Sequence, residues 1–473
     1  MKVVAMLGDE KKLDSGDMFH VFNVDELIPA NHLLRRLDAV LDTSWVRKEV
    51  AECYSDRGRP SWDPEVIIRM ILLGYLYDLS EVRLVDELGM HMGYRWFCRL
   101  QPSDPVPDRT TLVKIRNEKW KSDIWRQLLE RTIIQCLEAG LVSGRHVSID
   151  GTKIKANASW GSLEPIEPVV SLDEYLENRF SWSDKVEESK DDDNDDDVDP
   201  TPKGGVNFKG KSLKNDEYQS KSDPDARIYR KDDGEGACLA YIGNFCIDTK
   251  SRVVLGAEAS PGRTNGEWTA GINMLDFIDE VLGFMPEIVT ADKGYGVVPF
   301  YSEVEKRGII SHIPTRNRTS ETRLPKSRLL AMKTVPFDRA KKMIARRRGI
   351  KARNRIQHLK HTTGYQVSRL LRLRVEHKIG EAKECHGLRR ARHRGLDKVD
   401  HQVKITAAIM NLKQLAKLGG RTLGATASLS TSIAGLFHRQ RSLIERMLSR
   451  VLHQIFETSP RMAPASSHSS QGF

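Results

Sequence analysis

The spacing of apolar residues predicts helices in the first part of the chain. Up to about residue 140, apolar side chains recur at three- and four-residue intervals, which is typical of amphipathic helices. This spacing predicts helical structure over residues 19–41, 64–75, 80–88, from about 110, and 120–139. Asp63 and Ser80 suit N-caps, Pro64 suits a first helical position, and Thr110 and Thr111 are interpreted as caps of the fourth helix.

From about residue 145 the pattern changes from helical spacing to alternation, which is typical of strands. Strands are predicted over residues 146–150, 239–247, 253–257, 287–292 and 309–313. The second and third are joined by turn residues and predict a hairpin. Helices are predicted over residues 267–281 and 298–307 and around Glu376. This order predicts a mixed sheet with helices on its faces, hence an α+β or α/β fold.

Three domains follow from these patterns. Residues 1–140 form a helical domain, residues 141–418 a mixed-sheet domain, and residues 419–473 a C-terminal extension. Residues 159–220 are polar, highly charged and poor in aromatic residues, which predicts a flexible acidic insertion. In the extension, an amphipathic helix is expected over residues 428–452 and a disordered tail over residues 459–473.

The chain is basic, with a formal net charge of +10. Seven aspartates lie in one short run within residues 191–199, and without them the formal charge of +10 would become +17. A positive body attracts polyanions, and nucleic acid is the usual partner, although a ribosome- or membrane-surface protein has similar charge. The six cysteines show no paired spacing, and residues 66–77 are too short to span a bilayer. A cytoplasmic protein without a membrane segment is expected.

Three acidic residues are the candidate catalytic groups. Asp150 ends the first alternating run, and Asp292 ends the strand-like run of residues 287–292. Ligands of open sheets usually bind at the carboxyl ends of strands, and a charge buried there needs a compensating cation. Glu376 lies in a basic helical stretch. Two strand-end aspartates and one helix glutamate can converge into a carboxylate cluster for two magnesium ions.

The predicted helix around Glu376 presents cations on the same face as the carboxylate. At 100° per residue, Arg369, Arg372 and Lys383 lie within about 40° of Glu376. A glutamate on a metal beside cations on DNA phosphates would produce this pattern, and so would a solvated face with ordinary ion pairs. The two strand-end aspartates favour the functional interpretation. The neighbouring histidines, His312, His358, His361 and His377, lack zinc-type spacing and are interpreted as phosphate contacts or surface residues.

These motifs resemble those of bacterial insertion-sequence transposases of the DDE class, which have a ribonuclease-H-like catalytic domain. The similarity rests on Ile-Asp-Gly-Thr-Lys at 149–153, Ala-Asp-Lys-Gly-Tyr at 291–295, and Arg-x3-Glu-x6-Lys over residues 372–383. The segment Ser-Asp-Pro-Asp-Ala-Arg at 222–227 also looks like a motif of this group. The family signature has a tyrosine three residues before the arginine, where this chain has Arg369.

The resemblance implies a DNA transposase that binds the terminal inverted repeats of its element, cuts them with metal-activated water, and joins the 3′-OH ends to target DNA. Asp150, Asp292 and Glu376 would hold two Mg²⁺ (or Mn²⁺) ions. Double-stranded DNA would be the partner, with a homodimer in the DNA complex and action at the bacterial nucleoid. DNA contacts are expected from these residues: Lys153, Lys293, Tyr295, Arg346, Arg347, Arg348, Lys351, Arg369, Arg372 and Lys383.

Two alternatives remain at this point. A nuclease of the same fold would cut DNA without rejoining it, and a decayed transposase would only bind DNA as a repressor. The basic stretch of residues 341–355 favours contact with the DNA backbone over a mobile basic loop, but such contacts carry no base information.

Overall fold

The protein is described here from a computed structural model, which describes residues 23–54, 61–120, 123–166, 214–215, 217–230, 236–262, 264–315 and 337–422. The run of seven aspartates, the helix expected over residues 428–452 and the tail over residues 459–473 lie outside these residues. The chain up to Lys417 forms one compact unit.

The first part of the chain is helical, as predicted. Its helices are α1 Val24–Leu27, α2 Leu33–Asp38, α3 Val46–Glu49, α4 Pro64–Leu76, α5 Glu81–Met90, α6 Met92–Phe97, α7 Arg109–Lys114 and α8 Asp123–Glu138, with a 3₁₀ turn at Ala51–Cys53 (η1) and a π-helical turn at Ile115–Lys119 (η2). The predicted caps of α4 and α5 are confirmed, since Asp63 accepts from Glu65 N and Ser80 from Arg83 N. The prediction of one helix over residues 19–41 is wrong. The helix is interrupted because Ile28, which precedes Pro29, has an extended backbone, as residues before proline prefer.

The cap of α7 differs from the prediction. Asp108, rather than Thr110 or Thr111, is the N-cap, and its carboxylate accepts hydrogen bonds from Thr111 N at 3.0 Å and from Thr110 Oγ1 at 2.5 Å. The two threonines therefore donate to the cap. An aspartate satisfies the free N–H groups of a first helical turn and also interacts favourably with the helix dipole.

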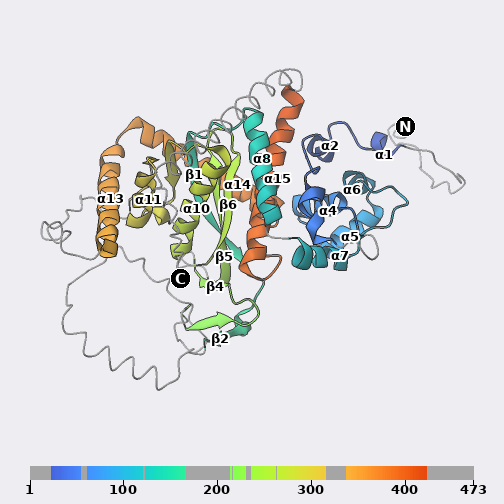
Figure 1. Ribbon diagram of the computed structural model, residues 1–473, viewed down its shortest axis with the longest axis horizontal. Coiled ribbons are helices and arrows are strands. Elements are labelled where there is room, and N and C mark those ends of the chain that lie inside the picture. The colour runs from blue at the N-terminus through green and yellow to red at the C-terminus, as the bar shows by residue number, and fades with distance from the viewer. Residues whose placement is uncertain are drawn as a thin grey trace, which may run out of the picture. The chain divides into compact units, whose positions relative to one another are not determined.

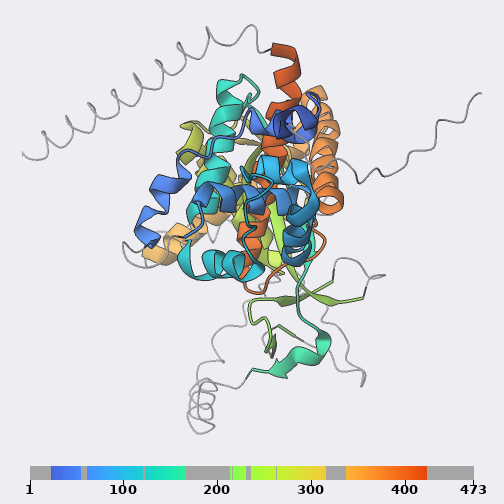
Figure 2. The same cartoon turned by 90° about the vertical axis from the view of Figure 1, so that its right-hand side faces the viewer.

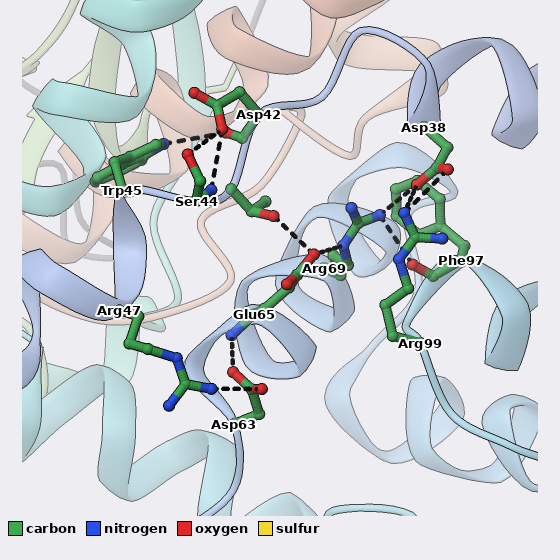
Figure 3. Close-up of polar contacts among 11 residues, drawn as sticks. Asp38, Asp42, Ser44, Trp45, Arg47, Asp63, Glu65, Arg69, Phe97 and Arg99 are labelled. Atoms are coloured by element: carbon green, nitrogen blue, oxygen red, sulfur yellow. Dashed lines mark hydrogen bonds and ion pairs between the residues drawn. The ribbon is translucent and has the colours of Figure 1, made fainter.

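A buried arginine joins the N-terminal helices (Figure 3). The side chain of Arg69 is 3% exposed and pairs with Glu65 at 2.9 Å and Asp38 at 2.6 Å, and it also donates to the carbonyl of Phe97. Asp38 binds Arg99 as well. Burial would raise the pKa of Glu65, but hydrogen bonds from Thr43 and Arg69 outweigh burial and lower it. α2, α4 and the end of α6 are thus connected by one network of charges.

The second part of the chain contains one mixed sheet. Its strands are β1 His146–Lys155, β4 Arg227–Tyr229, β5 Cys238–Asp248, β6 Val254–Pro261, β7 Ile288–Ala291 and β8 Ile310–Ser311. The strand order is β4-β5-β1-β7-β8, and β6 pairs with β5. β1 is antiparallel to β5 and parallel to β7, which is parallel to β8. The predicted hairpin is confirmed as the antiparallel pair β5 and β6.

Helices pack against this sheet, as predicted for an α+β, ribonuclease-H-like domain (Figure 1). The helices of this part are α10 Thr264–Leu282, α11 Val298–Lys306, α13 Phe337–Leu359, α14 Thr363–Cys385 and α15 Leu396–Thr422, of which α13 packs on α11 rather than on the sheet. α10 packs against β5 and β6, while α14 packs against β1 and β7. α15 runs beside α8 in both views (Figures 1 and 2), and Asn411 of α15 donates to Thr132 of α8.

The predicted insertion is structured at both of its ends. β2 Leu163–Pro165 pairs with β3 Tyr218–Ser220 in a separate two-stranded sheet, and Trp160–Ser162 (η3) precedes β2. Residues 159–166 and 217–220 are therefore not the flexible chain expected from their polarity. Ser162 and Ser220 join the two strands through their hydroxyls at 2.8 Å.

Replacing Arg69 by methionine should destabilise the protein strongly. The substitution keeps the volume of the side chain but leaves Asp38 and Glu65 without their buried partner, which typically costs about 3–5 kcal/mol. Urea denaturation followed by circular dichroism would measure this loss.

Arg83→Met is the matched control, because Arg83 also pairs with a glutamate four residues away, Glu87, but is 69% exposed. Its loss should cost less than about 1 kcal/mol. Equal effects of the two substitutions would contradict the structural role assigned to Arg69.

Candidate active site

The parallel pairing of β1 with β7 brings the two candidate aspartates together. Ile149 is the register partner of Ala291, so Asp150 and Asp292 are the next residues on neighbouring strands. Neighbouring strands lie about 4.8 Å apart, and paired residues project from the same face. The expectation that Asp150 ends its strand is wrong, because β1 continues to Lys155 along β5. Asp150 lies where the parallel pairing ends, and Asp292 directly follows β7 as predicted.

Glu376 comes from α14, which packs on β1 and β7. Arg372, one turn earlier, lies between the acidic groups. Its guanidinium is 2.8 Å from the carboxylate of Glu376 and 3.9 Å from that of Asp150. Asp150 is 18% exposed and Glu376 is 46% exposed, so Glu376 reaches in from the solvent side of the site. One guanidinium thus neutralises charge on both carboxylates.

The charges of the site are coupled. Burial, together with the nearby charges of Asp292 and Glu376, raises the pKa of Asp150 to about 6, although the guanidinium of Arg372 opposes this shift. Asp150 also accepts a hydrogen bond from Gly151 N at 2.9 Å. A raised pKa means that the ionised form of the carboxylate is destabilised in the folded protein. A bound cation would stabilise that ionised form.

A hydroxyl between two histidines holds α14 against the sheet. Ser368 Oγ lies 2.9 Å from His146 Nε2 on β1 and 2.7 Å from His312 Nδ1 after β8. Burial lowers the pKa of both rings, so both are neutral near pH 7. A neutral imidazole has one donor and one acceptor nitrogen, and a hydroxyl can donate to one ring while accepting from the other.

Ser368 lies two turns before Glu376, so this contact fixes the position of α14, and with it of Glu376, along the sheet. Arg374 adds a second tie by donating to the carbonyl of Thr249 at 2.5 Å. The interpretation of His312 as a phosphate contact or surface residue is wrong, because its side chain is buried against Ser368. Sequence reasoning missed His146 and Ser368, since neither belongs to a motif.

Some of the remaining residues predicted to contact DNA are exposed to solvent, and others are not. Arg369 and Lys293 are exposed, and Lys383 is half-buried on α14. Lys153 is three residues from Asp150 along β1, so it lies on the opposite face of that strand. The prediction that Tyr295 contacts DNA is corrected. Tyr295 is 1% exposed, and its hydroxyl donates to Asn244 beneath the sheet.

The basic stretch before α14 is a helix, not a loop. In α13, Arg346, Arg347 and Lys351 are exposed, and Arg348 is half-buried. Arg347 and Lys351 share a face of the helix at the four-residue spacing of a surface ridge. The opposite side of α13 packs on α11, where Gly349 closely approaches the carbonyl of Val298. α13 is therefore held against α11 on one side and exposes Arg346, Arg347 and Lys351 to solvent on the other.

The motif at residues 222–227 supports the fold at a distance from the carboxylates. Asp223 is completely buried and accepts hydrogen bonds from Tyr241 Oη at 2.5 Å and from Gly395 N at 3.0 Å. Asp225 accepts from Leu396 N at 2.9 Å. The two aspartates hold the first residues of α15, so this motif is structural.

The side chains do not by themselves form a closed metal site. Among the described residues, no three His, Cys, Asp or Glu side chains are arranged to hold a metal ion. The donor set nevertheless fits a hard divalent cation, because it consists of carboxylate oxygens on an open edge. The guanidinium of Arg372 stands between Asp150 and Glu376 where positive charge is favoured.

Two family comparisons identify the class of protein. Residues 22–118 match the family described as "Transposase domain (DUF772)", and residues 205–412 match the family described as "Transposase DDE domain". Together the matches cover more than half of the chain, and it belongs to the insertion-sequence transposases of the DDE class. The second match contains Asp292 and Glu376 but begins after Asp150. No solved structure matches the chain.

Members of this family are transposition enzymes that act on DNA and use divalent metal ions. The resemblance noted from the short motifs is thereby confirmed at the level of the family. None of the helices in the described ranges combines the length and the apolar character needed to cross a membrane.

Asp150→Asn should stabilise the metal-free protein at neutral pH. Because the folded chain raises the pKa of Asp150 to about 6, the ionised carboxylate destabilises the fold above that pH. The neutral amide removes this penalty of about 1–3 kcal/mol, and the gain should vanish below about pH 4, where the aspartate is protonated even in the unfolded chain. Thermal denaturation from pH 4 to 8 without metal measures it. A stability gain independent of pH would contradict the raised pKa.

Ser368→Ala should cost about 1–3 kcal/mol, because it leaves two buried imidazole nitrogens without their common partner. Ser302→Ala in α11 is the matched control, since the hydroxyl of Ser302 is also buried but has no hydrogen-bond partner in the described part of the chain. The control should be neutral or slightly stabilising in urea denaturation. If the two variants were equally stable, Ser368 would not hold α14.

Proposed function

We propose that this transposase binds the terminal inverted repeats of its element, cleaves the strand at each end and joins the resulting 3′-OH to target DNA. Asp150, Asp292 and Glu376 are the proposed catalytic residues and would hold two Mg²⁺ or Mn²⁺ ions. The observation that carries this proposal is the β1–β7 register, which puts the half-buried Asp150 and the exposed Asp292 side by side, next to the helix that bears the third carboxylate.

The reaction needs no covalent bond to the protein. Water adds to the phosphorus at the element end, and the bond from phosphorus to the 3′ oxygen breaks to leave a 3′-OH. That hydroxyl then attacks a phosphorus of target DNA and displaces a 3′ oxygen there. Two bound divalent ions would activate the attacking oxygen and stabilise the leaving oxygen in both steps.

Arg372 has two roles in this proposal. Without metal it neutralises Glu376 and, more weakly, Asp150. With divalent cations held by Asp150, Asp292 and Glu376, the guanidinium of Arg372 would be available to the substrate, because its planar fork suits phosphate oxygens. Arg372, Lys383, Arg369 and Lys293 would then contact DNA near the cut. Arg369 replaces the tyrosine of the family signature, so a phosphate contact is proposed there rather than stacking on a base.

The DNA path would extend from α14 to α13. The exposed residues Arg346, Arg347 and Lys351, with half-buried Arg348, provide charge for backbone contacts, which add affinity without base specificity. Lys153 would contact DNA on the other side of β1. Salt dependence of binding would measure the number of phosphates engaged.

The domain assignment forms part of the proposal. Residues 1–140 would recognise element ends or mediate dimerisation, residues 141–418 would carry the chemistry, and residues 419–473 form an extension. Because two element ends must be joined together, a homodimer is proposed for the DNA complex. Action on chromosomal DNA implies the bacterial cytoplasm and its nucleoid.

Glu376→Gln should abolish strand cleavage and joining, with a loss of at least about 10³-fold in rate, because the amide removes the negative charge needed to bind metal. DNA binding should remain largely intact. The assay uses Mg²⁺, DNA carrying the element end and a target plasmid, and separates cleaved from joined products on a gel.

Glu384→Gln is the matched control, because Glu384 lies on the same helix but forms an exposed ion pair with Arg389. Cleavage without joining by the unmodified protein would favour a related nuclease, and binding without cleavage would favour a repressor. Full activity of Glu376→Gln would contradict the assignment of the three carboxylates.

A further inference from the structure

A cavity of about 500 Å³ lies away from the three carboxylates, where α4, α5 and α7 face the first turns of α15. Its apolar walls are formed by Ile71, Leu79, Leu84, Leu112, Val113 and Ile405. Two aromatic side chains, Tyr75 and Trp125, also line it. Cavities of about 300–1,000 Å³ with mostly apolar walls and a few polar groups are typical of sites for small organic ligands.

The polar groups of this cavity are mainly cationic. Arg109, Arg116, Arg392 and Lys398 line it, whereas Asp78 and Glu81 are its only carboxylates. Arg392 pairs with Asp78 at 2.8 Å, and Arg116 and Arg109 share Glu81. Lys398 has no ion pair among the residues that the structure describes. Four cations against two carboxylates leave a net charge of about +2, which favours an anionic ligand.

Several buried polar atoms of the cavity side chains have no hydrogen-bond partner within the described ranges. They are both ring nitrogens of His401, Trp125 Nε1, Arg116 Nε and Arg392 Nε. His401 is 9% exposed and Trp125 only 1%, so water reaches these groups poorly. Leaving a buried donor unsatisfied costs about 1–3 kcal/mol, and a ligand that accepts these hydrogen bonds would remove this cost.

The charge around the cavity also acts on its histidines. Burial, reinforced by Arg116, Arg392 and Lys398, lowers the pKa of His393 to about 3, and burial lowers that of His401. Both imidazoles are therefore neutral at pH 7. A neutral ring offers one donor and one acceptor, which is the pattern found on the edges of nucleobases.

We propose that this cavity binds a single nucleotide, with its base between the apolar and aromatic walls and its phosphate at Arg116, Arg392 and Lys398. A simple anion would satisfy the cations but would leave the large apolar volume and Trp125 unused. A purely apolar ligand would leave the cations and His401 unsatisfied. A ligand that combines a flat polar ring with a phosphate matches both halves of the cavity.

The nucleotide has two possible sources, a free mononucleotide or an unpaired nucleotide of a DNA strand. A path of backbone and backbone hydrogen bonds connects the cavity to the candidate active site. β1 runs from Asp150 to Lys155, whose backbone pairs with Arg389 and Ala391, and Arg392 follows in the cavity wall. At about 3.4 Å per residue, the β1 part of this path spans roughly 17 Å. The proposal goes beyond the catalytic function and does not require it.

Isothermal titration of the full-length protein with deoxyadenosine monophosphate, deoxyadenosine and inorganic phosphate tests the proposal. The monophosphate should bind at one site and at least tenfold more tightly than either fragment. Lys398→Gln should weaken it about tenfold, the usual effect of losing one charge-assisted hydrogen bond. Val113→Phe should abolish binding by filling the cavity. Lys114→Gln, which removes an exposed lysine next to Val113 that does not line the cavity, should have no effect.

A second arm distinguishes the sources. A DNA hairpin with a one-nucleotide 5′ overhang is compared with a blunt hairpin. A preference for the overhang that Val113→Phe removes would assign the site to DNA, and binding of the monophosphate without such a preference would assign it to a free nucleotide. Equal binding of phosphate and monophosphate, or insensitivity of both ligands to Val113→Phe, would overturn the proposal. Glu376→Gln should leave all these affinities unchanged, so that this test stays separate from the catalytic one.

Discussion

The parallel register between β1 and β7 is the constraint on which the candidate active site depends. Ile149 opposite Ala291 makes Asp150 and Asp292 neighbours, and a shift of one residue would turn one carboxylate to the other face of the sheet. Burial of Asp150, to which the nearby charges of Asp292 and Glu376 add, raises its pKa, while the guanidinium of Arg372, 3.9 Å away, opposes this shift. The fold therefore concentrates negative charge at this edge of the sheet, where a bound cation is favoured. Members of the matched family use divalent metal ions.

Buried polar contacts then position the helices relative to this pair of strands. Ser368 fixes α14 through two histidines, Asp223 fixes the start of α15, and Arg69 joins the N-terminal helices. Such contacts add little net stability when intact but are costly to break, because each leaves an unpaired group in a medium of low dielectric. They restrict the packing to one arrangement, which the proposed catalytic role of Glu376 on α14 requires.

The segment after the catalytic helix connects the two parts of the protein. His386 approaches the carbonyl of Tyr75, and Arg392 donates to the carbonyls of Leu79 and Gly74 while it stacks over Tyr75. Arg392 and His393, in the basic segment after α14, line a cavity against the N-terminal helices. Two segments matched to separate transposase families thus meet through side chains that also form the proposed nucleotide site.

Local patterns in the sequence were sufficient for α4, α5, α8, α10 and α11, the hairpin, the caps Asp63 and Ser80, and the strand before Asp292. These features depend on neighbours within a few residues, so a single sequence contains their cause. The position of Asp150 in mid-strand, the burial of Tyr295 and the pairing of His312 with Ser368 were decided only by tertiary structure. Strand register and helix packing join residues more than fifty positions apart. These contacts form because distant parts of the chain bury their surfaces against each other, and the sequence near each residue does not specify its partner.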